Sequence, residues 1–351
     1  MSGSGGFPRS GPRAAIPTAA PIAGEHEGRE NAGHPLAAAR IGRVPDFFIV
    51  GHEKCGTTAL HTMLRRHPDV YMPDFKEPRF FAPEVRAGAP RDHQRADTLE
   101  GYLALFAAAQ PGQLIGEASP QYLRFPMSAA RIAELAPEAR IIAILREPAS
   151  FLHSVHLQAL QAGRETERDL RKALALEQPR RQGKHIPRGF SSPVWLLYSD
   201  FVRYAEQLRS YERLFSRERM LVLIYDDYCD DNEGTLRRAL RFLELDDSFP
   251  IETVRTGRSR TTVRFVGMHP LSRKLRLARH RPELAGPFAR TVLAMSSKPL
   301  RVLWRRVAYA SAPPPDEGLM LELRRRFKPE VEAVSEYLER DLVSLWRYDS
   351  V

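Results

Sequence analysis

Phe47-Phe-Ile-Val-Gly-His-Glu-Lys-Cys-Gly-Thr-Thr58 is the clearest local pattern in the chain. It opens with four apolar, strand-forming residues and is broken at Gly51, a pattern typical of a short, buried parallel strand. Residues 58–66 then carry apolar side chains on one helical face. We therefore expect a strand, a tight loop and a helix N-terminus. Such a terminus binds anions, because its first N–H groups lack helical partners and carry the positive end of the helix dipole.

The chain as a whole is large enough for a substantial core. It has 351 residues, of which 43% are hydrophobic, which suits one large α/β domain or two small ones. It has two cysteines, Cys55 and Cys229, without a CxxC or a Cys/His cluster. This pattern predicts neither a disulfide framework nor a zinc site, and it favours a reducing compartment.

The ends of the chain and its hydropathy bear on location. Residues 1–43 are rich in Gly, Pro, Ala and Arg, a composition that cannot bury enough surface to fold, so we expect a disordered tail. The tail lacks the charged-then-apolar order of a signal peptide. No apolar run approaches the roughly 18 residues of a membrane span. We therefore expect a soluble, cytoplasmic protein.

Apolar runs alternate with helical patterns along the chain after the opening stretch. A short predicted strand runs into a loop over 114–123, and further predicted strands lie at 141–145 and 220–225. Predicted helices lie at 99–109, 128–135, 149–162, 195–215, 232–243 and 329–346. This alternation predicts an α/β fold, a P-loop-like three-layer sandwich in which helices flank a central parallel sheet, over residues 44–351. Ligands bind at the carboxyl ends of such strands, so the loops after Val50, Leu145 and Tyr225 should converge.

The first loop has an unusual lysine position. Gly51 and Gly56 have the spacing of a nucleoside-triphosphate P-loop, but Thr57-Thr58 follow where that loop has Lys-Ser/Thr. The lysine is Lys54, inside the loop and nearer the helix mouth. A P-loop lysine must reach the β/γ-phosphates and its Ser/Thr must hold Mg²⁺. The loop therefore predicts a site for a 5′-phosphate group without an obligatory metal, and the alternative is an ordinary strand-to-helix turn.

A second anion site is predicted at the strand that ends at Leu145. Arg146 closes this strand, and Ser154 lies about a turn into the next helix, so both side chains can point at one phosphate. Alone, an arginine at a strand end is more often a plain surface residue. Paired with the first loop on a neighbouring strand, it indicates a nucleotide phosphorylated at both ends.

Three motifs in this order resemble a known family. The loop Lys54–Thr58, the segment Lys76-Glu-Pro-Arg-Phe-Phe81 and the segment Leu145-Arg-Glu-Pro…Ser154 are similar to sulfotransferases that use 3′-phosphoadenosine 5′-phosphosulfate (PAPS). The resemblance is to the branch shared by heparan sulfate sulfotransferases and many bacterial enzymes, and it runs from about Pro45 to the C-terminus. It implies a sulfotransferase domain over residues 44–351 with PAPS as co-substrate and no metal.

The resemblance also implies roles for individual residues. The implied nucleotide site comprises Lys54, Cys55, Gly56, Thr57, Thr58, Arg146, Ser154, Arg258 and Arg260. The residues of the first loop would cradle the 5′-phosphosulfate, and the arginine and serine of the third motif would hold the 3′-phosphate. The last two arginines, in a later basic loop, would close over the nucleotide.

The implied catalytic carboxylate is Glu77, which lies 23 residues after Lys54. An acceptor hydroxyl or amine must lose its proton as it attacks sulfur, so a positioned carboxylate can act as general base. Lys54 would stabilise the charge that develops on the bridging oxygen. His52 and His61 are alternative bases, and a charged surface turn is the alternative for the Glu77 segment. His153 and His156 lack a third ligand at matching spacing and predict no metal site.

The acceptor is left open by the sequence. Heparan sulfate enzymes have a lysine where Glu117-Ala-Ser-Pro120 has Ala118, which argues against a heparan-like acceptor. A hydroxyl or amine of a carbohydrate, a lipid or a secondary metabolite remains. Residues 163–193 are polar and basic, so we expect them to form a lid or acceptor loop.

The positive charge is concentrated in one segment. Residues 255–309 hold 14 Lys and Arg against one acid, whereas the whole chain has a net charge of +10. We predict a basic helical segment over 255–312 that lines the site, contacts an anionic membrane surface or, least favoured, binds nucleic acid. The competing functions are a P-loop kinase that uses Mg-ATP and a noncatalytic membrane or nucleic-acid binding protein.

Overall fold

The structure is a computed structural model that describes residues 42–86, 96–187, 192–254, 261–263, 309–311 and 314–351. Most of the predicted tail, together with Arg258 and Arg260, lies outside these residues. The last tail residue, Arg43, is held in place, because its guanidinium donates to the carbonyl oxygens of Gln110 at 3.0 Å and Gln113 at 2.6 Å. The folded domain therefore begins slightly before residue 44.

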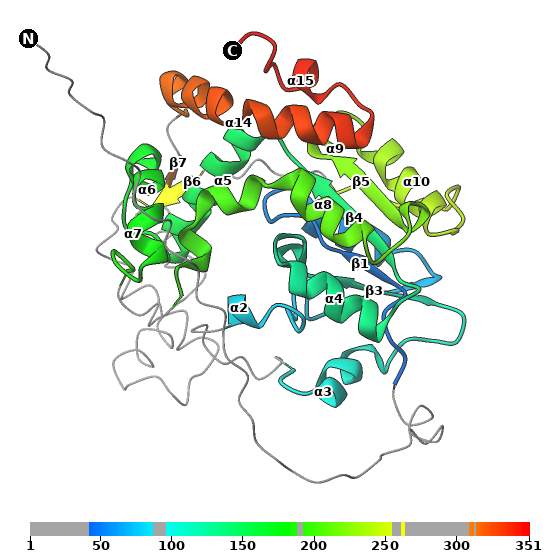
Figure 1. The fold of residues 1–351 in the computed structure, drawn as a ribbon. Coiled ribbons are helices and arrows are strands. Elements are labelled where there is room, and N and C mark those ends of the chain that lie inside the picture. The colour runs from blue at the N-terminus through cyan, green and yellow to red at the C-terminus, as the bar shows by residue number, and fades with distance from the viewer. Residues whose placement is uncertain (1–41, 87–95, 188–191, 255–260, 264–308, 312–313) are drawn as a thin grey trace, which may run out of the picture. The chain divides into compact units, whose positions relative to one another are not determined.

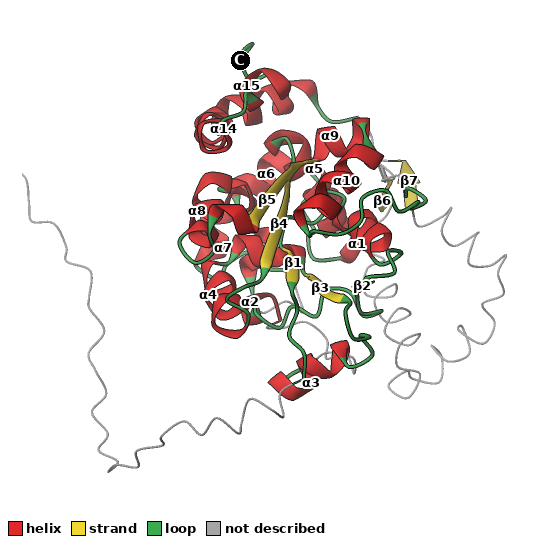
Figure 2. Ribbon diagram, turned by 90° about the vertical axis from the view of Figure 1, so that its right-hand side faces the viewer, coloured by secondary structure: helices red, strands yellow, loops and turns green. Residues whose placement is uncertain are grey.

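Five parallel strands form the central sheet in the order β2-β3-β1-β4-β5. Figure 1 labels β1, β3, β4 and β5, and Figure 2 also labels β2. They are β1 (Phe47–Ile49), β2 (Val70–Tyr71), β3 (Leu114–Ala118), β4 (Arg140–Leu145) and β5 (Met220–Ile224). The opening strand β1 is wholly buried and pairs with β3 on one side and β4 on the other. The sequence predicted every strand of this sheet except β2. The two residues of β2 are too few to show a period.

Helices cover both faces of the sheet. The α-helices up to residue 181 are α1 (Thr57–Leu64), α2 (Pro83–Arg86), α3 (Leu99–Leu103), α4 (Pro126–Leu135), α5 (Pro148–Ala162), α6 (Leu170–Ala175) and α7 (Glu177–Arg181). The later ones are α8 (Tyr204–Glu212), α9 (Tyr225–Asp230), α10 (Asn232–Phe242), α14 (Glu317–Leu338) and α15 (Leu342–Leu345). Figure 2 shows α4 and α8 on one side of the strands and α1 and α10 on the other. The predicted three-layer sandwich is confirmed.

Two predicted helices are shorter than expected. Residues 195–215 form the 3₁₀ turns Pro193–Leu196 and Tyr198–Val202 before α8. Leu197 and Arg203 have ψ of 77° and 56°, outside the helical region, and each ends a turn. The predicted helix at 99–109 is α3 followed by the 3₁₀ turn Ala104–Phe106.

The predicted loop over residues 163–193 contains two helices, α6 and α7. Asp169 caps α6 by accepting hydrogen bonds from the amides of Arg171 and Lys172. A buried ion pair joins Arg180 of α7 to Glu165 at 2.8 Å. The segment is thus a packed part of the domain over its described residues, and its role as a lid or acceptor loop stays a prediction.

The C-terminal helix begins earlier than predicted. The side chain of Asp316 caps helix α14 by accepting a hydrogen bond from the amide of Leu319. The helix runs through Pro329 and ends at Leu338, and the next residue, Glu339, has φ of 51°. The short helix α15 follows it. Helix α14 packs mainly against α5 and α8, so it covers a helical layer where direct docking on the sheet was expected.

Two short strands lie within the segment predicted as basic and helical. Strands β6 (Thr261–Val263) and β7 (Tyr309–Ser311) pair antiparallel, and β6 lies against α5. The helical prediction is therefore wrong for these residues, and the rest of the segment falls outside the described ranges. Among the helices that the structure describes, none is long and apolar enough to span a membrane.

The strand order indicates where along the carboxyl ends of the strands a ligand would bind. From β1 the chain crosses to β2, beyond β3, whereas from β4 it crosses the other way to β5. The order therefore reverses between β1 and β4. Ligands of open parallel sheets bind outside the carboxyl ends of the strands at this switch point, where the loops after β1 and β4 begin.

Candidate active site

The loop after β1 is shaped by two glycines. A Cβ on Gly51 would lie 2.5 Å from the backbone nitrogen of Ile144 in β4, so only glycine allows this close approach. Gly56 has φ of 89° and precedes the first residue of α1, a conformation that glycine adopts without strain. Lys54 also has a positive φ, 66°. The chain reverses within this loop and enters α1 directly.

The N-terminus of α1 is suited to an anion. Its first turn contains no acidic residue, and Gly56 offers no side-chain cap. In the described part of the chain, the first amide of α1 that donates to a backbone carbonyl is that of Ala59, 2.9 Å from the oxygen of Gly56. The amides of Thr57 and Thr58 come before it, so they are the orphan donors of a helix start.

Two positive side chains meet at this loop. The Nη1 of Arg146, just after β4, donates to the main-chain carbonyl of Lys54 at 3.0 Å. Burial and then the nearby guanidinium of Arg146 lower the pKa of Lys54. Two cations this close repel each other, and a bound anion would relieve that repulsion.

The second predicted anion group differs in its hydroxyl. Arg146 Nε donates to Ser150 Oγ at 3.2 Å, and its guanidinium lies 4.7 Å from the centroid of the Tyr225 ring. Ser154, the predicted partner, lies one turn further along α5 than Ser150, on the same helical face. Sequence reasoning missed Ser150, although its spacing of four from both neighbours was the available signal.

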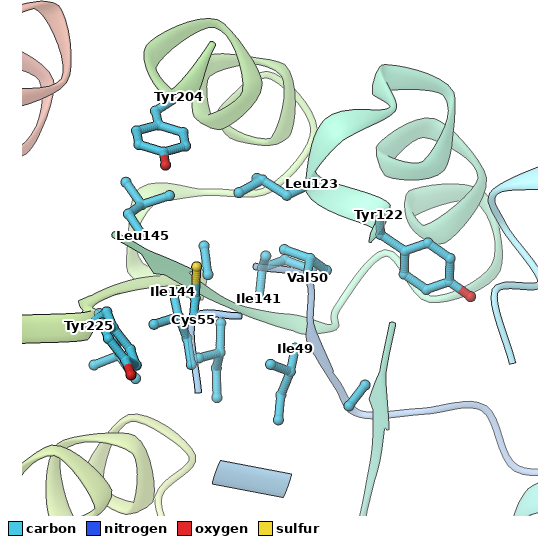
Figure 3. Packing of buried hydrophobic residues seen from close by; sticks show 14 of the residues in the cluster. Ile49, Val50, Cys55, Tyr122, Leu123, Ile141, Ile144, Leu145, Tyr204 and Tyr225 are labelled. Atoms are coloured by element: carbon cyan, nitrogen blue, oxygen red, sulfur yellow. The ribbon is translucent and has the colours of Figure 1, made fainter. Parts of the chain in front are cut away.

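Cys55, a predicted nucleotide contact, faces the core. Figure 3 shows its sulfur beside Ile144 among the buried apolar side chains. Its thiol lies 3.6 Å from the carbonyl oxygen of Glu53, and burial raises its pKa to about 12. Cys55 can therefore contribute to the loop only through its backbone.

Glu77 lies in a charged cluster at the end of the sheet. Its Oε1 accepts from Lys76 Nζ at 2.7 Å, and its Oε2 accepts from Arg79 Nη2 at 2.5 Å. Burial alone would raise the pKa of Glu77, but these two cations outweigh it and lower the pKa to about 2. The segment is docked on β3, because the amide of Glu77 donates to the carbonyl of Ala118 at 3.2 Å. The carboxylate is thus fixed and ionised.

Sequence reasoning missed two residues beside Glu77, which are Gln121 and Glu53. Gln121, in the 3₁₀ turn Pro120–Arg124, donates from Nε2 to Glu77 Oε2 at 3.1 Å and to Glu53 Oε2 at 3.0 Å. The loops after β1, β2 and β3 meet through this amide. The only signal in the sequence was the position of Gln121 directly after the Glu117–Pro120 motif.

The two alternative bases are both buried histidines. His52 is buried against the rings of Phe151 and Tyr204, and its Nε2 lies 2.9 Å from Gln207 Oε1. Burial lowers its pKa to about 3, and burial lowers the pKa of His61, in α1, to about 4. His61 lies near enough to Lys76 and Glu77 for their charges to act on it, whereas Glu77 is the candidate that hydrogen bonds tie to the loops after β1 and β3.

The ring of Trp195 contacts two arginines near Glu77. The guanidinium of Arg164 lies 4.3 Å from the centroid of Trp195, and that of Arg79 lies 5.5 Å from it. Burial lowers the pKa of Arg164, while the carboxylate of Glu53 raises it. The segment predicted to receive the acceptor therefore does reach the surroundings of Glu77.

Comparison with known proteins identifies the family. A family model described as "Sulfotransferase domain" matches residues 44–264. The chain belongs to the sulfotransferase family. A sulfotransferase of known structure from Alicyclobacillus acidocaldarius is 26% identical, with 87% of this chain and 99% of that chain covered and a TM-score of 0.63. The likeness to this sulfotransferase thus extends over nearly the whole of its fold.

Curated sulfotransferases are similar over part of their length. Carbohydrate sulfotransferase 15 of Mus musculus is 27% identical over 261 residues, which cover 59% of this chain and 45% of that protein. Heparan sulfate glucosamine 3-O-sulfotransferase 3B1 of Mus musculus is 28% identical over 203 residues, which cover 58% and 47%. This sulfotransferase-family chain spans about half the length of the curated relatives it matches.

Proposed function

We propose that the chain transfers a sulfuryl group from PAPS to a hydroxyl or amine of an acceptor. The observation that carries this proposal is the contact between Arg146 and the carbonyl of Lys54. It brings the anion-binding start of α1 and a guanidinium from the next strand to one switch point, as a nucleotide with phosphates at both ends requires. Family membership supports sulfuryl transfer and does not favour the kinase or noncatalytic alternatives.

The residues present fit the donor. The amides of Thr57 and Thr58, with Lys54, would bind its 5′ end, because they are the unpaired donors and the cation of the loop. Arg146 uses two of its five N–H groups on Lys54 and Ser150, which leaves three for the 3′-phosphate. Ser154 would add a hydroxyl from α5. Roles for Arg258 and Arg260 stay predictions. When bound, PAPS supplies an activated sulfuryl group and a bisphosphate leaving group.

Glu77 would take the proton of the acceptor. Its two oxygens offer about four lone-pair sites, and Lys76, Arg79 and Gln121 occupy three of them. One site is left for the O–H or N–H of the acceptor. The low pKa keeps Glu77 ionised at neutral pH, the form that accepts a proton. It also makes the carboxylate a weak base, because general-base catalysis is most efficient with a pKa near the working pH. Lys54 would meanwhile stabilise the negative charge of the departing oxygen.

A carbohydrate is the first acceptor class to test. The relatives named carbohydrate and heparan sulfate sulfotransferases support it, while Ala118 still argues against a heparan-like chain. Lipid and secondary-metabolite acceptors are the further classes. A cytoplasmic location, membrane contact through residues 255–309 and the lack of a nucleic-acid partner stay predictions from the sequence.

The activity test uses donor labelled with ³⁵S and separate pools of neutral glycans, anionic glycans, lipids and small metabolites. We expect label transfer into one pool, a large loss with Lys54→Ala and Glu77→Gln, and none with Glu100→Gln, which replaces an exposed carboxylate on α3. Transfer that survives both site substitutions would show that the assigned residues are wrong. Label in no pool, with no bisphosphate binding, would contradict the function.

A further inference from the structure

One side chain joins the three loops on the acceptor side of the site. The strands β2, β3 and β1 are neighbours in the sheet, and the loops that follow them carry Glu77, Gln121 and Glu53. The Nε2 of Gln121 lies 3.1 Å from one carboxylate and 3.0 Å from the other. Without this donor, two carboxylates would face each other across the gap with no hydrogen between them.

The orientation of the Gln121 amide follows from these neighbours. An amide oxygen in place of Nε2 would meet two carboxylate oxygens, which are acceptors, and could donate to neither. The nitrogen must therefore face Glu53 and Glu77, and the carbonyl oxygen Oε1 must face the other way. The two carboxylates therefore fix the direction of Gln121 Oε1.

The carbonyl oxygen of Gln121 has no partner among the described residues. Gln121 is only 5% exposed, and its Oε1 is buried without a donor. A buried acceptor without a donor is costly, and native proteins rarely leave one unless water or a ligand fills it. The orphan oxygen belongs to the same amide group whose nitrogen holds Glu77, so a donor bound to it would lie next to the hydrogen bond that fixes the carboxylate.

We propose that Gln121 is a positioning and specificity residue: it ties Glu77 to Glu53, and its Oε1 receives a second hydrogen-bond donor of the acceptor, adjacent to the attacking hydroxyl or amine. The proposal rests on the proposed function, because it takes Glu77 as the base. The acceptor class it names carries two neighbouring donors, either two hydroxyls or a hydroxyl and an ammonium group.

The surroundings agree with a donor-bearing ligand. The oxygens of Glu53, Glu77 and Gln121 are all acceptors at this point, whereas the cations Lys76 and Arg79 are already engaged with Glu77. The ring of Trp195 is buried beneath the guanidinium groups of Arg79 and Arg164, so the acceptors are the groups that select the ligand. A ligand with two adjacent donors matches these neighbouring acceptors.

The test follows the side-chain NH₂ resonances of Gln121 in ¹⁵N NMR spectra of the full chain saturated with adenosine 3′,5′-bisphosphate. Gln121→Met, which keeps the length and removes both polar atoms, assigns the resonances. The probes are trans-cyclohexane-1,2-diol, trans-2-aminocyclohexanol and cyclohexanol. We expect saturable shifts with the two-donor probes and about tenfold weaker binding of cyclohexanol, as the loss of one hydrogen bond implies. Tighter diol or amine binding then separates the hydroxyl from the ammonium class.

Several outcomes would overturn the proposal. Equal binding of cyclohexanol, or a two-donor preference that survives in Gln121→Met, would show that Oε1 receives no ligand donor. Shifts with no probe would mean that this oxygen takes a water only. Bisphosphate binding is measured in the same samples: if it persists in wild type and in Gln121→Met, the donor site stands whatever the probes do, so failure here is separable from failure of the proposed function.

Discussion

Arg146 Nη1 donates to the main-chain carbonyl of Lys54 at 3.0 Å, across 92 residues of sequence. This bond joins the residue that follows β4 to the loop that follows β1, on the two sides of the switch point. The arginine is therefore both an anion-binding group and a support for the loop. Most of the chemistry we assign to the chain depends on how rigidly this loop is held.

Gly51→Ala tests the close approach of the loop to β4. The new Cβ would lie 2.5 Å from the nitrogen and 2.9 Å from the oxygen of Ile144, both backbone atoms of a central strand. We expect a loss of about 1–3 kcal/mol in the free energy of unfolding, as for overpacked cores, and weaker bisphosphate binding. Gly42→Ala is the matched control, since its Cβ would meet nothing closer than 3.6 Å. Equal denaturation midpoints for both variants would contradict the close approach.

Glu77→Gln should lower the rate of sulfuryl transfer by roughly 10²–10⁴-fold and leave bisphosphate binding unchanged, because it removes a general base. The depressed pKa of Glu77, about 2 against an ordinary 4.5, also stabilises the fold. That stabilisation is fully present above pH 4.5 and is lost as the pH falls toward 2. Wild type and variant should therefore converge in stability over this window. A stability difference that grows on acidification would refute the ion pairing.

Local pattern predicted the fold well where elements are regular. Strands β1, β3, β4 and β5 and the sandwich followed from apolar runs that alternate with helices. The two-residue strand β2 has no period to read. The 3₁₀ turns before α8 were not predicted. Their buried residues, such as Tyr198 and Phe201, have the spacing of a helical apolar face, while the backbone leaves the helical region.

The site was predictable to the extent that spacing carries chemistry. Lys54, Arg146 and Glu77 stand in motifs, and in the structure they lie in loops that follow the carboxyl ends of the strands. Ser150 and Gln121 act through contacts between strands that only the folded chain creates. The inward direction of Cys55 was also hidden, because the loop conformation decides which side chains turn to the core.

The buried ion pair of Glu165 and Arg180 should hold the acceptor segment in place. Both side chains are almost fully buried, and the same carboxylate accepts from Tyr198 at 2.9 Å. Arg180→Met leaves an uncompensated buried charge, so we expect a loss of about 3–5 kcal/mol in unfolding free energy. Tyr198→Phe should cost about 1 kcal/mol. Comparable losses in chemical denaturation would show that the ion pair is not the main restraint.

Cys55 should be inert in the folded chain. Burial raises the pKa of its thiol to about 12, and alkylation requires the thiolate. In a Cys229→Ser background, iodoacetamide should label Cys55 only as fast as the chain unfolds, and bisphosphate should not slow labelling beyond its effect on stability. Rapid labelling of the native protein, followed by mass spectrometry, would place the thiol in the nucleotide site.

Isothermal titration with adenosine 3′,5′-bisphosphate tests the proposed nucleotide site. We predict one site per chain, binding at least about tenfold weaker in Lys54→Ala and Arg146→Met, a loss of about 1.4 kcal/mol or more for each cation removed, and unchanged binding in Glu77→Gln. ATP with Mg²⁺ should bind more weakly than the bisphosphate. Absence of bisphosphate binding, or tighter binding of Mg-ATP that depends on the same lysine, would contradict a site for a nucleotide phosphorylated at both ends.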